Sequence, residues 1–411
     1  MLRRLPLVVV AVALVVAAFS TAFDFLFFLL YLGLLVVGGS YVLTRLGLSD
    51  LEAGYAVSQL HAHVGEQLRV TYTLRNTGHV PKPSLEVHNP TSLPGGLPGR
   101  AISLRPTAER SWLVRVPLTR RGHFRIEPLQ IRTGDPFGFF ESSATVGQGV
   151  TVVVYPRVER LPFWRLPAAE LEGSHAHRER TLQATPLATS VRPYAPGDAM
   201  NRIHWKTTAR YGEIQVKEFD LEQTADAWIF VDLQRDIQAG HGDESTVEAA
   251  VRVAASVADR AIVENRAVGM TVNAHRQTTV PSDRGARQHL KLMQLLAAVD
   301  ADGSTSLAES LVAGLGRVRR GTTVIVITPS LERDWIRPLG LLRGRGIGCV
   351  VVALDPTAYA RYGRTMPAGA VTELDDATAQ RTRALHHALA EYDIRNLTLT
   401  PGRPLGEVLV G

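Results

Sequence analysis

The side chains most capable of chemistry gather between Arg192 and Phe219. Asp198 and His204 form the one conspicuous pair of an acid and an imidazole in this stretch, and such pairs serve general acid–base catalysis. No neighbouring motif positions a substrate beside them. The sequence also contains no Gly-x-Ser-x-Gly, no Cys–His pair, no His-Glu-x-x-His and no phosphate loop ending in Gly-Lys-Ser or Gly-Lys-Thr. We therefore predict that the chain is not an enzyme.

The same stretch combines basic and aromatic side chains, for which two roles remain open. In the first, Ile203, Trp205 and Ala209 pack on a sheet while the charged side chains form a network that fixes the loop. In the second, Arg and Lys side chains meet an acidic partner surface with Trp205 or Tyr194 as anchor, because Trp, Tyr and Arg dominate interface energies. The residues with these two possible roles are Arg192, Tyr194, Gly197, Asp198, Arg202, Ile203, Trp205, Lys206, Arg210 and Glu218.

Turn signals and a short helix must position these side chains. Pro196 and Gly197 indicate a turn, residues 201–210 are predicted to form a short helix, and Gly212 stops it. An alternating strand then leads to the apolar run Trp228–Leu233.

Downstream of this stretch, predicted strands and helices alternate. The predicted strands are Trp228–Leu233, Gly269–Ala274, Thr323–Thr328, Cys349–Leu354 and Leu397–Leu399. The predicted helices are Thr246–Glu264, Ala286–Val299, Leu307–Val318, Trp335–Leu342 and Asp375–Tyr392. Ser245 with Glu248, and Ser306 with Glu309, have capping-box spacing. Continuous apolar strands that alternate with helices are typical of a sheet covered on both faces, so we predict an α/β domain with a mostly parallel sheet over residues 191–411.

Residues 51–156 show short runs of β-branched and aromatic residues separated by turn signals. This pattern predicts an antiparallel, Ig-like β-sandwich. Its predicted strands include Gln67–Leu74, Ser84–Val87, Ala101–Leu104, Ser111–Leu118, Phe124–Ile131 and Val150–Tyr155. Residues 157–190 have no sustained period and are predicted to be a connector. Its His175 and His177 lack partners at metal-binding spacing and are interpreted as exposed histidines.

Residues 1–46 are strongly apolar. The run Leu5–Phe19 and the run Phe25–Leu43 are separated at Asp24. We predict two membrane-spanning helices, over about residues 5–22 and 25–43, joined as a hairpin.

Basic residues flank both runs. Arg3 and Arg4 precede the first and Arg45 follows the second, so the positive-inside rule places both ends, and the soluble domains, in the cytoplasm. The alternative is that the first run is a cleaved signal peptide, which would leave one anchor and place the soluble part outside.

Composition excludes some classes of partner. The formal net charge is +6 over 411 residues, and the four lysines Lys82, Lys206, Lys217 and Lys291 are spread along the chain. Nucleic-acid binding would require clustered charge with interleaved aromatics, so we predict none. The single cysteine, Cys349, heads an apolar run; it fits a reducing compartment and is interpreted as a buried structural thiol.

Several motifs together resemble the signature of a bacterial family of unknown function, family fifty-eight. The signature motifs are Arg192-x-Tyr194-x-x-Gly197-Asp198, Arg202-Ile203-x-Trp205-Lys206, Ala209-Arg210 and Val216-x-Glu218-Phe219. Motifs similar to the sandwich that precedes this signature in many members are Arg120-Arg121-Gly122, Asp135-Pro-Phe-Gly138 and Val154-Tyr-Pro156. The resemblance covers most of the chain, including the leading spans.

The resemblance implies a von Willebrand factor A-like domain after the signature and a partnership with MoxR-type AAA+ ATPases. Those ATPases are thought to work with such domains as chaperones that remodel or activate client complexes, and the family has no established enzymatic activity. We therefore expect a membrane-anchored adaptor or chaperone subunit that acts with such an ATPase on a client complex. The alternative is a metal-dependent adhesion or ligand-binding module of the cell envelope.

A von Willebrand A-like domain can hold Mg²⁺ at the carboxyl ends of its strands, through Asp-x-Ser-x-Ser, a Thr and a second Asp. Here the first strand ends in Asp232-Leu-Gln234-Arg-Asp236, so both serines are missing, and Thr328-Pro-Ser330 stands where the second acid would be. Gly303-Ser-Thr305 is a counterpart of the Thr loop. Asp232, Asp236 and Thr305 are thus candidate ligands. We favour no metal or other cofactor, with Asp232 capping a helix or pairing with a signature arginine.

Overall fold

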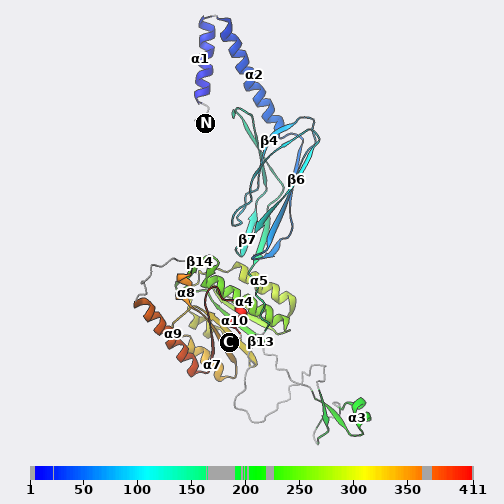
Figure 1. Ribbon diagram of the computed structural model, residues 1–411, viewed down its shortest axis with the longest axis vertical. Coiled ribbons are helices and arrows are strands. Elements are labelled where there is room, and N and C mark those ends of the chain that lie inside the picture. The colour runs from blue at the N-terminus through cyan, green and yellow to red at the C-terminus, as the bar shows by residue number, and fades with distance from the viewer. Residues whose placement is uncertain are drawn as a thin grey trace. The chain divides into compact units, whose positions relative to one another are not determined.

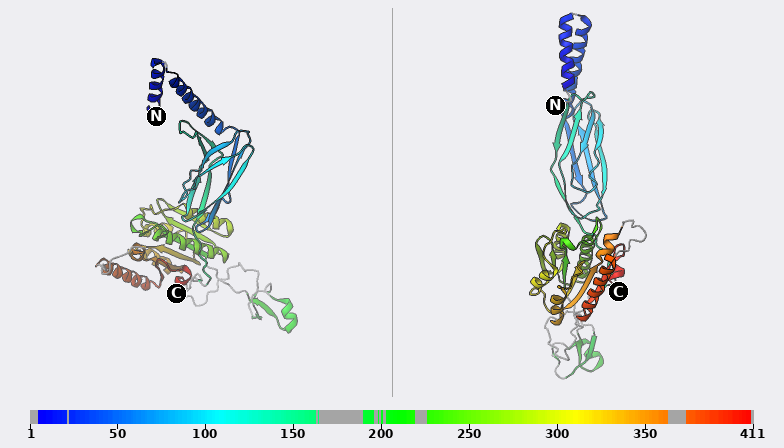
Figure 2. Two further views of the ribbon diagram at one scale, coloured as in Figure 1. Left: turned by 45° about the horizontal axis from the view of Figure 1, so that its top comes forward. Right: turned by 90° about the vertical axis from the view of Figure 1, so that its left-hand side faces the viewer.

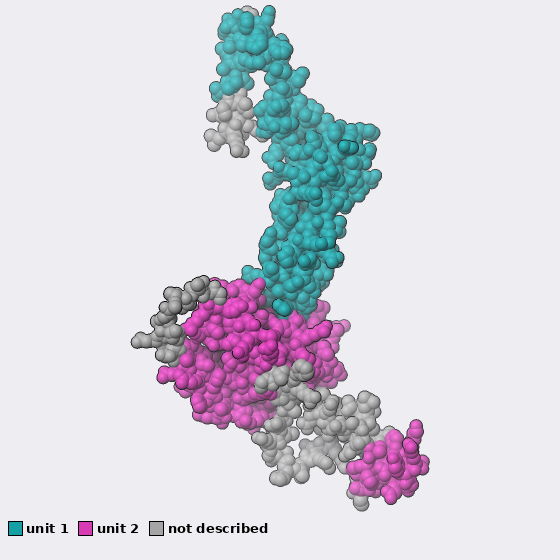
Figure 3. All heavy atoms as spheres, in the orientation of Figure 1, with its two compact units in different colours: residues 1–157, 293–298 teal, residues 158–292, 299–411 magenta. Residues whose placement is uncertain are grey.

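The computed structural model describes residues 5–21, 23–162, 164, 190–195, 198, 200, 203–218, 226–362 and 373–409 (Figure 1). The chain divides into two compact units (Figure 3). Unit 1 contains residues 1–157 and 293–298, and unit 2 contains residues 158–292 and 299–411. His175, His177, Gly197 and Arg202 lie outside the described residues.

Unit 1 begins with two apolar helices, α1 (Leu5–Thr21) and α2 (Asp24–Gly47). They pack against each other, with the rings of Phe19 and Phe27 edge to face at 5.3 Å. Among the described residues, α2 is the one helix long and apolar enough to cross a membrane, and the apolar segment Val9–Thr21 of α1 is shorter. The structure therefore supports one candidate span, and the second span remains a prediction.

The carboxyl-terminal end of α2 packs against the strands of unit 1. Ser40, Thr44 and Gly47 are buried, and their spacing of four and three residues places them on one face of the helix. The buried Lys82 donates from Nζ to the carbonyl of Leu46, where the helix dipole is negative and a cation is stabilising. Burial lowers the pKa of Lys82. The strands thus both cover and cap the end of the apolar helix.

The remainder of unit 1 consists of strands in three sheets, with the orders β1-β3-β6, β2-β10-β7 and β5-β4-β8-β9. Their neighbours are antiparallel except for β2 with β10, so the prediction of an antiparallel region is confirmed. The strands are β1 (Leu51–Val57), β2 (His61–His63), β3 (Gln67–Asn76), β4 (Lys82–His88), β5 (Arg100–Leu104), β6 (Glu109–Pro117), β7 (Gly122–Ile126), β8 (Leu129–Gly134), β9 (Glu141–Val146) and β10 (Val150–Tyr155).

The core of unit 1 follows from the alternation of its strands. In β3, every second side chain from Leu68 to Leu74 is buried, because successive side chains of a strand point to opposite faces. Tyr72 stacks on Trp112 at a centroid distance of 5.2 Å, and its hydroxyl donates to Asn89 Oδ1 at 3.2 Å. The one polar group of this buried ring is therefore satisfied.

One predicted strand of unit 1 is wrong. Phe124–Ile131 is two strands, because Pro128 has no N–H to donate to a ladder and the chain changes sheet at this point. Before it, β7 pairs with β10, and after it, β8 pairs with β4 and β9. Periodicity alone does not reveal such a change of partner.

Unit 2 is built on a six-stranded mixed sheet of order β17-β16-β13-β18-β19-β20. The neighbours from β16 to β20 are parallel, and β17 is antiparallel to β16. These strands are β13 (Asp226–Asp232), β16 (Val268–Asn273), β17 (Gln277–Asp283), β18 (Thr322–Thr328), β19 (Gly348–Leu354) and β20 (Arg395–Leu399). The parallel strands match the prediction, whereas the edge strand β17 was not predicted, since its Thr and Pro residues carry no apolar run.

Helices cover both faces of this sheet (Figure 2). Helices α6, α7 and α9 pack on the face that carries Trp228 and Phe230, and α4 lies on the other face. Ser245 accepts from the Glu248 amide at 3.3 Å at the start of α4, as its spacing predicts. The helices are α4 (Thr246–Val263), α5 (Gly285–Ala298), α6 (Leu307–Gly314), α7 (Ile336–Gly344), α8 (Pro356–Arg361), α9 (Glu373–Glu391) and α10 (Leu405–Val408). Helix α6 ends four residues before the predicted Val318.

Candidate functional site

The order of the strands creates a switch point between β13 and β18. From β13 the chain passes through α4 to β16 on one side, and from β18 it passes through α7 to β19 on the other. Open α/β sheets bind ligands at the carboxyl ends of the strands at such a point. Asp232 ends β13 and Thr328 ends β18, so these two residues define the candidate site.

Hydrogen bonds from the chain itself occupy both oxygens of the Asp232 carboxyl group. Thr328 Oγ1 donates to Oδ2 at 2.7 Å, and the Gln234 amide donates to Oδ1 at 3.2 Å. Thr328 Oγ1 in turn accepts from the Ser330 amide at 2.9 Å. The Asp232 side chain is 0% exposed. The switch point is therefore bridged by side chains rather than left open.

Asn273, which ends β16, extends this network. It lies opposite Asp232 in the parallel register, and its side chain hydrogen-bonds to that carboxyl group. Its Nδ2 also donates to the carbonyl of Thr305. Gly303 lies so close that a Cβ there would be 2.7 Å from the Asn273 carbonyl oxygen, so only glycine fits. The loop before α6 is thereby held against the strand ends.

Burial disfavours the ionised form of Asp232. It raises the pKa of this carboxyl, while the bonds from Thr328, Gln234 and Asn273 act in the opposite direction and the charge of Asp334 raises it further. Asp232 thus serves as a buried acceptor at the joint of two strands.

The residues present do not fit a Mg²⁺ site. Asp236 is exposed on the short 3-10 helix Arg235–Ile237, and Thr305 contributes its carbonyl to Asn273. Within the described part of the chain, no group of three His, Cys, Asp or Glu side chains could hold a metal ion. The candidates Asp232, Asp236 and Thr305 are therefore not brought together as ligands. Among the described residues, the partners of the Asp232 carboxyl are Thr328, Gln234 and Asn273, and its pairing with a signature arginine stays a prediction.

The signature residues form a small unit of their own. Strand β11 (Ser190–Pro193) pairs antiparallel with β12 (Gln215–Glu218), and helix α3 (Trp205–Tyr211) lies between them in the chain (Figure 1). Helix α3 starts at Trp205 because His204 caps it, and Gly212 ends it in the left-handed conformation. Ile203 and Val216 are buried together.

The charged signature residues are held in two separate contacts. Arg192 makes a bidentate ion pair with Asp198, with both N–O distances at 2.8 Å. His204 Nδ1 instead lies 2.6 Å from Thr207 Oγ1 and accepts from the Thr207 amide. The Asp198 carboxyl and the His204 imidazole thus pair with Arg192 and Thr207 and not with each other, and the Arg192–Asp198 contact fits the predicted charge network.

The outer face of α3 combines an aromatic residue with basic residues. Trp205 is 68% exposed, and Lys206, Ala209 and Arg210 are exposed as well. At about 100° per residue, these four positions cover one continuous face of the helix. Of the three residues predicted to pack, only Ile203 is buried in this unit. Tyr194, which follows β11, is 37% exposed, and of Glu218 the structure describes the backbone only.

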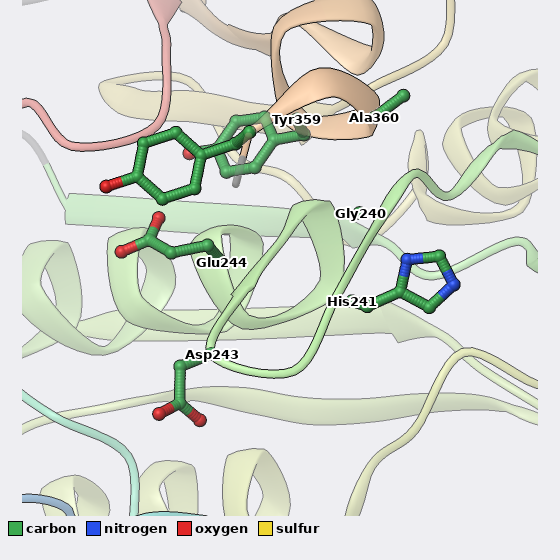
Figure 4. Close-up of a pocket in the computed structure, with 7 residues that line it drawn as sticks. Gly240, His241, Asp243, Glu244, Tyr359 and Ala360 are labelled. Carbon is green, nitrogen blue, oxygen red and sulfur yellow. The ribbon is translucent and has the colours of Figure 1, made fainter. Parts of the chain in front are cut away.

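A shallow hollow of about 380 Å³ lies beside the hairpin of β14 (Gly240–His241) and β15 (Glu244–Ser245), against α8 (Figure 4). Burial raises the pKa of its Tyr359 to about 12, although the charge of Arg252 acts in the opposite direction. The phenol therefore stays protonated at neutral pH and cannot act as a base. Sequence reasoning missed this hollow, because the hairpin has only two residues in each strand.

Comparison with known proteins follows the same division of the chain. Residues 190–396 match the family described as "Protein of unknown function DUF58". The chain belongs to this family. The matched segment runs from the first residue of β11 into β20, and so includes both the signature unit and most of the sheet.

Two relatives illustrate the range of similarity. The uncharacterised protein YeaD of Bacillus subtilis is 25% identical over 333 residues, which cover 79% of this chain and 79% of YeaD. The uncharacterised protein Rv1480 of Mycobacterium tuberculosis is 26% identical over 171 residues, which cover 40% of this chain and 54% of that protein. Neither name states an activity.

Solved structures give weaker matches. The CARDB domain of the PF1109 protein from Pyrococcus furiosus is 19% identical, covers 26% of this chain and 92% of its own, and has a TM-score of 0.19. A β-glucosidase from Listeria innocua is 13% identical, covers 26% of this chain and 16% of its own, and has a TM-score of 0.18. Scores this low carry no functional information.

Proposed function

We propose that the chain is a membrane-anchored adaptor or chaperone subunit that acts with a MoxR-type AAA+ ATPase to assemble or remodel a client complex. The observation that carries this proposal is the outer face of α3, where the exposed Trp205 lies beside Lys206 and Arg210. Trp and Arg are enriched among residues that dominate binding energies, and a basic face attracts an acidic partner. The ATPase itself is proposed from the family resemblance of the signature.

The switch point supports a binding role rather than a chemical one. Its central acid is buried, and the Thr328 hydroxyl and the Gln234 amide already occupy the carboxyl oxygens. We propose a von Willebrand A-like fold for this unit in which the metal-binding chemistry is replaced by a fixed network. The unit then serves as a rigid base for the signature.

The proposal places the soluble part in the cytoplasm. In the sequence, Arg3 and Arg4 precede the apolar helices and Arg45 follows them. The positive-inside rule then places both ends of the hairpin in the cytoplasm. This orientation requires α1 to cross the membrane together with α2. AAA+ ATPases that use cytoplasmic ATP would then meet the signature unit directly.

Replacing the aromatic anchor tests the proposed interface. The full chain in lipid nanodiscs is titrated with the MoxR-type ATPase of the same organism, and the Kd is measured for the unchanged chain and for Trp205→Ala. We expect Trp205→Ala to weaken binding by about 30-fold or more, since loss of a hot-spot side chain costs about 2 kcal/mol. Leu341→Ala is the matched control, because Leu341 is an apolar side chain that is 55% exposed on α7.

Two outcomes would count against the interface. One is that the unchanged chain does not bind the ATPase, which would show that this ATPase is not the partner. The other is that Trp205→Ala binds the ATPase as tightly as Leu341→Ala does. The ATPase would then still be the partner, but the interface would not include Trp205 on α3.

A further inference from the structure

The turn between β8 and β9 lies against the apolar helix. The ring of Phe140 packs edge to face on Tyr41 of α2 at a centroid distance of 5.5 Å. Asp135, at the other end of the turn, hydrogen-bonds to the buried Ser40 one residue earlier in the helix. Two independent contacts therefore fix this turn at the level of residues 40 and 41 of α2.

The turn is rigid and presents two phenylalanines. The Asp135 carboxylate accepts from the Phe137 amide at 2.9 Å and from the Phe140 amide at 2.6 Å. Gly138 takes a φ of 73°, which glycine adopts without strain. Phe137 is 62% exposed, and its ring stacks on Phe139 at 5.6 Å. Phe139 is half-buried, so the turn presents one exposed ring backed by a second, an arrangement that favours contact with an apolar surface.

The depth of the turn follows from the length of the helix. A span of about 20 residues crosses the hydrocarbon core, so a span that starts next to Asp24 ends near Thr44. Tyr41 then lies in the last turn of the span, next to the boundary between hydrocarbon and headgroups where Tyr is enriched. The guanidinium of Arg45 lies 5.8 Å from the centroid of the Tyr41 ring, within the range of a cation–π contact. A cation is expected at this boundary, where the hydrocarbon ends. Since Phe140 packs on Tyr41, the turn lies at the same level.

We propose that the Asp135–Phe140 turn enters the headgroup region of the bilayer beside α2, and that Phe137 and Phe139 form a second contact with lipid. This inference rests on the membrane anchor of the proposed function. The polar side chains Ser40 and Thr44 face the strands, so the lipid-facing side of α2 stays apolar while the turn extends the membrane contact sideways. Helix α2 and the turn then form two contacts with the membrane, and together they fix the orientation of the unit 1 strands relative to it.

Depth-dependent quenching tests this proposal. Phe137→Cys, Leu34→Cys and Leu60→Cys variants of the full chain are labelled with one thiol-reactive fluorophore and reconstituted into phosphatidylcholine–phosphatidylglycerol vesicles that hold nitroxide lipids of shallow or deep position. Leu34 is 72% exposed, ten residues into α2, and so reports the bilayer centre. Leu60 is 47% exposed and follows β1, which starts next to α2, so it reports the far end of the strands. The unchanged chain, with its buried Cys349, gives the background.

We expect the probe at 137 to be quenched several-fold more by the shallow nitroxide than by the deep one, the probe at 34 to show the reverse, and the probe at 60 to respond to neither. Quenching at 34 without quenching at 137 would overturn this inference and leave the anchor intact. Loss of quenching at both 34 and 137 would overturn the anchor and the inference together. Phe139→Cys serves as a second probe of the turn and must agree with position 137.

Discussion

At the scale of single residues, Asp232 shows how a residue suited to metal binding becomes part of the framework. Its carboxyl group is buried, accepts from Thr328 and Gln234, and joins the ends of two parallel strands. The ordinary pKa of 3.8 is raised in the folded chain, chiefly by burial. The folded state therefore holds the proton more tightly than the unfolded chain. The stability that Asp232 contributes is complete below pH 3.8 and is lost as the pH rises through its folded-state pKa.

Asp232→Asn should remove this dependence on pH. The amide keeps one acceptor for the Gln234 N–H and can donate to Thr328 Oγ1, so the network survives without a charge. As the pH increases from about 4, the variant should become more stable relative to the unchanged chain, and its thermal unfolding midpoint should rise accordingly. The difference in the free energy of unfolding should reach about 1.4 kcal/mol for each unit by which the pKa of Asp232 is raised. Thermal unfolding of the full chain in detergent at several pH values measures this difference. Asp236→Asn is the control, because Asp236 is exposed; a difference for Asp232→Asn that stays constant with pH would contradict the prediction.

The sequence indicates which residues carry polarity at the strand ends, but not which of them meet. Asp232 and Thr328 stand out because each ends a continuous apolar run, yet their 2.7 Å bond depends on the order of the strands. Asn273 ends another such run and could have been identified by the same signal. His204 is a case in which proximity in sequence misleads. It lies near Asp198 in the chain, but its role is to cap the amino terminus of α3.

At the scale of elements, the contact of α2 with the strands depends on a residue without a side chain. A Cβ on Gly47 would lie 2.7 Å from Thr133 Cγ2 and 3.0 Å from its Oγ1. Thr133 in β8 donates from Oγ1 to the carbonyl of Ser84, so it cannot simply turn away. The close approach therefore allows helix and strand to be in contact over the last turn of α2.

Gly47→Ala should weaken this contact by about 1–3 kcal/mol, as overpacking does. Adding Thr133→Ser removes the Cγ2 methyl while it keeps the hydroxyl, and should restore most of the loss. Gly39→Ala is the matched control in the same helix, because nothing lies within 4 Å of a Cβ there. Hydrogen exchange of β8 amides in nanodiscs measures the effect. If Gly39→Ala raised exchange as much as Gly47→Ala does, the close approach to Thr133 would not explain the result, because the higher helix propensity of Ala should by itself lower exchange.

Elements with one strong pattern are predictable, and elements with short or mixed patterns are not. Strands β13, β18 and β19 are buried on both faces and read as apolar runs, so their positions follow from the sequence. Strand β17 forms at the edge of the sheet with Thr, Pro and Ser residues and is held by pairing with β16. Tertiary contacts, rather than intrinsic preference, determine such edge strands.

At the scale of the whole molecule, the proposed orientation predicts protease resistance. If both ends face the cytoplasm, protease added to intact spheroplasts should leave residues from Leu51 onward uncut, and detergent should expose them. A tag at the carboxyl terminus and immunoblotting measure the length of the product. Cleavage before detergent is added would place the soluble part outside and support the arrangement with one anchor.

The pairing of β13 with β18 also determines the order in which parts of the chain can fold during synthesis. Thr328 and its partner Asp232 are 96 residues apart, so the centre of the sheet cannot form until most of unit 2 has left the ribosome. The strand pairs of unit 1 lie within residues 51–155, and the apolar helices precede them. Insertion of α2 and pairing of strands β1 to β10 can therefore finish while the Asp226–Asp232 segment still lacks β18 on one side. That segment is the part of the nascent chain most in need of protection from aggregation.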